Sequence, residues 1–60
     1  MSPAVRGRLI QALQLLIHEA EEKERDFAAQ GTIAAGVLES GWQRVAQTWR
    51  EKLAEVQDAH

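Results

Sequence analysis

The chain has 60 residues and a formal net charge of −2, and 45% of its residues are hydrophobic. A chain of this length forms one domain at most and buries a small share of its surface, so its stability is marginal. It contains no cysteine, which excludes disulfides and thiolate metal sites and leaves oligomerisation or partner binding as the way to stabilise the fold.

Membrane insertion is also excluded by the pattern of apolar residues. The longest apolar runs, such as Leu15–Ile17, are far too short for a membrane-spanning helix or the core of a signal peptide. We expect a soluble, cytoplasmic protein that is complete from Met1. The slight negative charge argues against a general affinity for nucleic acid or anionic membranes, although a local basic face remains possible.

The first predicted element is a long helix over residues 3–29. Ser2 is a favoured N-cap and Pro3 a favoured first helical residue. Beyond them, apolar residues recur at steps of three and four as far as Phe27, which is the period of an amphipathic helix and not of a strand.

A turn over residues 30–32 follows. Gly31 can adopt the left-handed conformation that ends a helix, and Thr32 can cap the next one.

The second predicted helix covers residues 33–58. Its apolar positions recur with the same period, but Ser40-Gly41-Trp42-Gln43 also fits a capping box that would break the helix there. Because Leu38 and Trp42 stay in phase across Ser40, we favour one continuous helix.

So short a connection forces the two helices to run antiparallel, as an all-α helical hairpin that forms a single domain over residues 1–60. Folding about Gly31 pairs positions whose numbers sum to roughly 62, so that Leu13 faces Trp49 and Ala20 faces Trp42.

The two tryptophans indicate that the hairpin associates. Trp42 and Trp49 lie two turns apart on one face, and one opposing helix cannot remove the roughly 150–250 Å² of a large aromatic side chain from water. A second hairpin would close a four-helix bundle, most simply as a homodimer with coiled-coil packing, although a different protein could fill that place. The predicted core and dimer interface comprises Leu9, Leu13, Leu16, Ala20, Phe27, Leu38, Trp42, Val45, Trp49, Leu53 and Val56.

The outer face of the first helix is the candidate surface for a protein partner. Leu15 lies opposite the apolar stripe, beside a charge run over residues 18–26, and Ile33 and Val37 also fall outside the second stripe. The alternative is a solvated surface with scattered apolar residues, which is common. The candidate residues are Leu15, His18, Glu19 and Glu22.

Basic residues suggest a second kind of partner. Arginines near the free ends of the two helices could contact nucleic-acid phosphates in a symmetric dimer, although nearby carboxylates dilute them and no aromatic residue is free to stack on bases. The candidate nucleic-acid face comprises Arg6, Arg8, Arg44 and Arg50.

No residues form a catalytic, metal or cofactor site. His18 and Glu22 supply only two metal ligands on an exposed face, and His60 is the last residue. No histidine is placed to activate a hydroxyl, and no glycine-rich phosphate loop follows a strand. We therefore expect no enzymatic activity and no cofactor.

The architecture resembles two groups of small proteins: the Rop-like helical-hairpin dimers that bind RNA and regulate plasmid copy number, and the hairpin co-chaperones of bacterial secretion systems. We expect a small non-enzymatic regulator or adaptor of the inhibitor or co-chaperone type, of bacterial or phage origin, that acts by protein–protein binding. The alternative is a Rop-like nucleic-acid-binding regulator that uses the basic face of a dimeric bundle.

Overall fold

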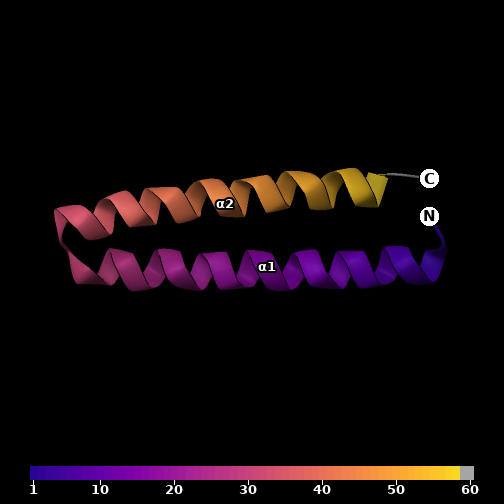
Figure 1. Ribbon diagram of the computed structural model, residues 1–60, viewed down its shortest axis with the longest axis horizontal. Coiled ribbons are helices and arrows are strands. Elements are labelled where there is room, and N and C mark those ends of the chain that lie inside the picture. Colours follow the sequence, from indigo (N-terminus) through magenta and orange to yellow (C-terminus); the bar gives the residue numbers. More distant parts are fainter. Residues whose placement is uncertain (59–60) are drawn as a thin grey trace.

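The computed structural model describes residues 1–58, so His60 lies outside the described part of the chain. It consists of two antiparallel helices, α1 over Pro3–Gln30 and α2 over Ile33–Asp58, and the start of α1 lies beside the end of α2 (Figure 1). The Cα atoms extend over 45 × 14 × 10 Å, the shape of a single layer of helices. Residues 1–58 contain no strand, and the predicted all-α hairpin is confirmed.

Both ends of α1 have the local structure that the sequence predicts. The backbone amide of Val5 donates a hydrogen bond to Ser2 Oγ at 3.2 Å, which satisfies one of the free amides of the first turn. Gly31 has φ 67° and ψ 17°, the left-handed conformation that stops α1. The helix ends at Gln30, one residue beyond the predicted bound.

α2 begins immediately after this turn and runs without a break. The amide of Ala35 donates to Thr32 Oγ1 at 3.0 Å, so Thr32 is the N-cap. Farther along, the Ser40 hydroxyl donates to the Gly36 carbonyl at 3.1 Å. Ser40 thus bonds back to its own helix instead of capping a new one, and Gly41 continues α2.

The core between the helices is thin. Its buried residues include two larger side chains, Leu13 and Val56, but the other members are small. The buried alanines are Ala20, Ala35 and Ala46. Small residues at these positions let the two helices approach closely, and no large side chain within residues 1–58 is enclosed completely.

The predicted core and dimer interface residues divide into three groups in the hairpin. Leu13, Ala20 and Val56 are buried between the helices. Leu16 and Leu38 are exposed, with 37% and 49% of their surface accessible, so they lie outside the contact between α1 and α2. The remainder, including both tryptophans, are half-buried: Leu9, Phe27, Trp42, Val45, Trp49 and Leu53.

Two glycine-to-alanine substitutions compare the effect of a β-carbon in the turn with its effect inside a helix. Gly31→Ala places a β-carbon at positive φ, which we expect to lower the free energy of unfolding by about 1–2 kcal/mol. Gly36→Ala adds a β-carbon that meets nothing within 4 Å in the first turn of α2, and we expect it to raise that energy by up to about 1 kcal/mol. Urea unfolding followed by circular dichroism measures both changes, and an equal effect of the two variants would contradict this account of the turn.

Candidate functional site

The predicted partner residues lie together on the outer face of α1. Leu15, His18, Glu19 and Glu22 are spaced so that the helix brings them to one side, and all are exposed. His18 Nε2 lies 3.0 Å from Glu22 Oε1. Leu15 is 58% exposed and is the only large apolar side chain of the four. The face can therefore offer one apolar contact surrounded by charges.

Arg6 does not project into solvent with the other arginines. Its Nε donates to the Val56 carbonyl at 3.1 Å, and its Nη2 donates to the Gln57 carbonyl. These carbonyls belong to the last turn of α2, where helical partners are missing and the helix dipole is negative. A guanidinium at this point joins the start of α1 to the end of α2, and the pair Arg6–Val56 has the register expected from folding about Gly31.

A second contact links the middle of the two helices. Arg50 Nη2 lies 2.8 Å from Glu21 Oε2, and both side chains are close to half exposed. Such surface pairs contribute little to stability, but this one occupies the Arg50 guanidinium. Arg8 and Arg44 are exposed. Two of the four arginines of the candidate nucleic-acid face therefore make contacts within the hairpin, a feature that the sequence does not reveal.

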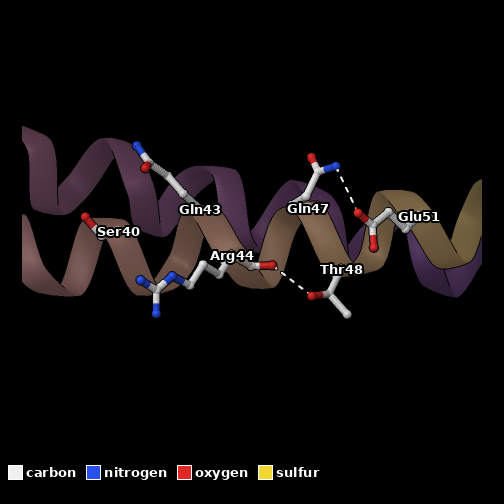
Figure 2. Close-up of a pocket in the computed structure, with 6 residues that line it drawn as sticks. All are labelled: Ser40, Gln43, Arg44, Gln47, Thr48 and Glu51. Atoms are coloured by element: carbon white, nitrogen blue, oxygen red, sulfur yellow. Dashed lines mark hydrogen bonds between the residues drawn. The ribbon is translucent and has the colours of Figure 1, made fainter.

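The outer surface of α2 is a shallow polar strip, drawn in Figure 2. Thr48 Oγ1 donates to the Arg44 carbonyl at 2.9 Å, and Gln47 Nε2 donates to a carboxylate oxygen of Glu51 at 3.2 Å. These groups satisfy one another along a single helix and do not converge on a common point, so the strip resembles a solvated helix surface. The lining residues are Ser40, Gln43, Arg44, Gln47, Thr48 and Glu51.

Among residues 1–58 there is no group of three or more potential metal ligands, no buried polar side chain, and no helix long and apolar enough to cross a bilayer.

The apolar surface is more extensive than the Leu15 face alone. The start of α2 exposes Ile33 at 91% and Val37 at 69%. The sequence places both residues outside the second apolar stripe. Their position outside the stripe is the signal that predicts exposure to solvent. With Leu38, they make the first turns of α2 an apolar segment that contacts solvent.

Comparison with known proteins gives no further guide to function. No protein-family model matches the chain, and neither a curated protein nor a solved structure is significantly similar to it.

The contact of Arg6 with the end of α2 can be tested by a matched pair of variants. Arg6→Met keeps an unbranched apolar stem but removes the donors to Val56 and Gln57, and we expect it to lower the free energy of unfolding by about 1–2 kcal/mol. Arg8→Met, two residues along α1 and on its exposed side, should change it by less than about 0.5 kcal/mol. Equal losses in urea unfolding would mean that the Arg6 contact does not stabilise the hairpin.

Proposed function

We propose that this protein is a small, non-enzymatic regulator or adaptor of the inhibitor or co-chaperone type, which acts by binding other proteins. We propose further that it works in the cytoplasm as a homodimer in which two hairpins complete a four-helix bundle. The observation that carries the proposal is the surface that a single hairpin leaves exposed.

The accessible surface of the hairpin is 4522 Å² for a mass of 6.7 kDa. A folded monomer of this mass typically exposes about 3,900 Å², so the hairpin exposes about 600 Å² more than expected. The excess approaches the roughly 800 Å² per partner of a standard protein interface. The exposed large hydrophobic residues are Met1, Val5, Leu15, Leu16, Ile33, Val37 and Leu38.

These exposed residues fall into two groups, for which we propose different partners. Val5, Leu16 and Leu38 flank the helix contact, where a second copy can extend the core. Leu15 lies on the outer face of α1 with the acidic segment, and would remain accessible to a different protein in such a dimer. We assign regulatory binding to this outer face, with Leu15, His18, Glu19 and Glu22 as its contact residues.

Nucleic-acid binding is less well supported. A phosphate-binding face needs several free cations on one side, and Arg6 and Arg50 already contact the end of α2 and Glu21. Arg8 and Arg44 come from different helices, and Arg44 belongs to the polar outer strip of α2.

Sedimentation equilibrium tests the proposed oligomer. We expect a reversible dimer of the 6.7 kDa chain at micromolar concentration, because an interface of standard size supports affinities in this range or tighter. A chain that remains monomeric at several hundred micromolar would contradict the homodimer.

The regulatory surface is tested by affinity capture from the cell of origin with three immobilised proteins: the wild type, Leu15→Glu and Gln11→Glu. Gln11→Glu adds the same charge one turn away on the exposed side of α1 without removing an apolar side chain. We expect a partner that is retained by the wild type and by Gln11→Glu, and that loses at least tenfold in affinity for Leu15→Glu when the interaction is repeated with purified proteins. A partner that binds all three proteins equally would exclude the Leu15 face.

Selective capture of nucleic acid instead of protein, reduced by salt and by Arg44→Glu, would favour the alternative function.

A further inference from the structure

The hairpin has two unlike sides flanking the contact between its helices. The Glu21–Arg50 ion pair marks one of them, which is charged. At 3.6 residues per turn, the opposite side receives Val5, Leu9, Ala12 and Leu16 from α1, and Ala34, Leu38, Gly41 and Val45 from α2. We call this opposite side the apolar side.

Burial distinguishes the apolar side from the charged one. Val5, Leu16 and Leu38 are 53%, 37% and 49% exposed, and Leu9 and Val45 are half-buried. On the charged side the corresponding residues of α1, Ile10 and Ile17, are already half-buried. The apolar surface that flanks the helix contact and still faces water therefore lies mainly on one side.

The apolar side does not extend along the full length of either helix. In both helices the apolar residues follow steps of four, three and four. Continued by the same steps, the series reaches Glu19 and Lys23 in α1, and Thr48 and Lys52 in α2. Each helix is thus apolar on this side only in its first half.

Because the helices are antiparallel (Figure 1), their first halves lie at opposite ends of the hairpin. The apolar band therefore runs diagonally across the side. Its two halves are offset by about 18 Å along the helices, at 1.5 Å per residue, and by about 8–10 Å across them. The band is tilted by about 25–30° from the helix axes.

Consider a second hairpin related to the first by a two-fold axis. Its apolar band can cover the band of the first only if the helices of the two hairpins cross at about twice the tilt, or about 50–60°. For right-handed helices, the direction of this diagonal gives a negative crossing angle. This agrees with the common class of helix packing near −50°. A copy aligned at the 20° of a regular bundle would instead bring Leu9 against the lysines of the second halves, Lys23 or Lys52.

Charge selects between the two directions that such a crossed copy can take. The segment 18–26, toward the loop, is rich in carboxylates. The open end carries Arg6, Arg8, Arg50 and Lys52 beside three carboxylates, Glu51, Glu55 and Asp58, which leaves a small excess of positive charge there. Opposite charges approach when the loop of one hairpin lies toward the open end of the other.

We propose that a second copy of the chain covers the apolar side, crossing at about 50° with the two loops at opposite ends. This rests on the homodimer of the proposed function, but it replaces the near-parallel packing of a regular four-helix bundle with two crossed hairpins. The arrangement sets Leu9 of each copy against the partner's Leu38, and Ala12 against the partner's Gly41. In the single hairpin, a β-carbon at Gly41 would meet nothing within 4 Å, so the space beside it is available to a second copy.

Two neighbouring leucines provide the first test. Leu16→Glu places a charge at the centre of the proposed interface, and Leu15→Glu places the same charge on the outer face of α1. We expect Leu16→Glu to raise the dimer dissociation constant at least thirtyfold and Leu15→Glu to change it less than threefold, both by sedimentation equilibrium. If Leu16→Glu dimerises as well as the wild type, the assigned interface is wrong while the homodimer stands. A monomeric wild type would overturn both.

Disulfide cross-linking tests the crossing without relying on the stability of a charged variant. Because the chain has no cysteine, each introduced cysteine is unique. We expect Leu9→Cys mixed with Leu38→Cys to form a mixed disulfide under mild oxidation, since facing cysteines meet the required Cα separation of about 4.4–6.8 Å. Leu9→Cys mixed with Lys23→Cys or with Lys52→Cys should give none.

Efficient linkage of Leu9→Cys to Lys23→Cys or Lys52→Cys would mean that the hairpins are aligned, and self-linkage of Leu9→Cys would mean that the loops lie at the same end. Either result would overturn the proposed arrangement.

Discussion

Two helices packed side by side can enclose only the residues that lie directly between them. Nearly every feature of this protein follows from that constraint. The positions at the centre of the contact are mostly alanines, namely Ala20, Ala35 and Ala46. The large side chains, including both tryptophans, lie at the edges of the contact and stay partly in water. Burial of apolar surface is the main favourable term in folding, and a single hairpin uses only part of what its sequence provides.

Polar contacts secure the two ends of the hairpin rather than its middle. Gly31 and Thr32 form the turn at one end, and Arg6 joins the start of α1 to the last carbonyls of α2 at the other. Between them, the one ion pair that joins the two helices within residues 1–58 is Glu21–Arg50, which is partly exposed. The hairpin is thus fixed in register at its ends, while its apolar side is left for association.

The sequence predicts the helices well because their ends depend on local chemistry. Ser2, Gly31 and Thr32 each act through backbone groups only a few residues away, so the pattern of capping residues is sufficient. The lateral position of the contact is harder to predict, since the apolar arc of each helix is wider than the strip that one neighbour covers. Leu13 and Leu16 both belong to that arc, yet only Leu13 is buried. The predicted core omits Ala46, which is completely buried, because Ala46 lies on the flank of the second apolar stripe and the sequence does not show that the contact with α1 is centred there.

In the candidate sites too, features set by local spacing are predictable from the sequence, and contacts between the two helices are not. The spacing of Leu15, His18 and Glu22 places them correctly on one outer face. The contact of Arg6 with Val56 joins two residues that are fifty positions apart in sequence and depends on the register between the helices, so the sequence alone predicts a free cation at Arg6. The central claim, that this fold is completed by a second copy, is tested most directly by the thermal unfolding midpoint as a function of protein concentration. If association completes the core, the midpoint rises steadily over a thousandfold range of concentration, because dimerisation is linked to folding by mass action. A midpoint that is independent of concentration would contradict the account.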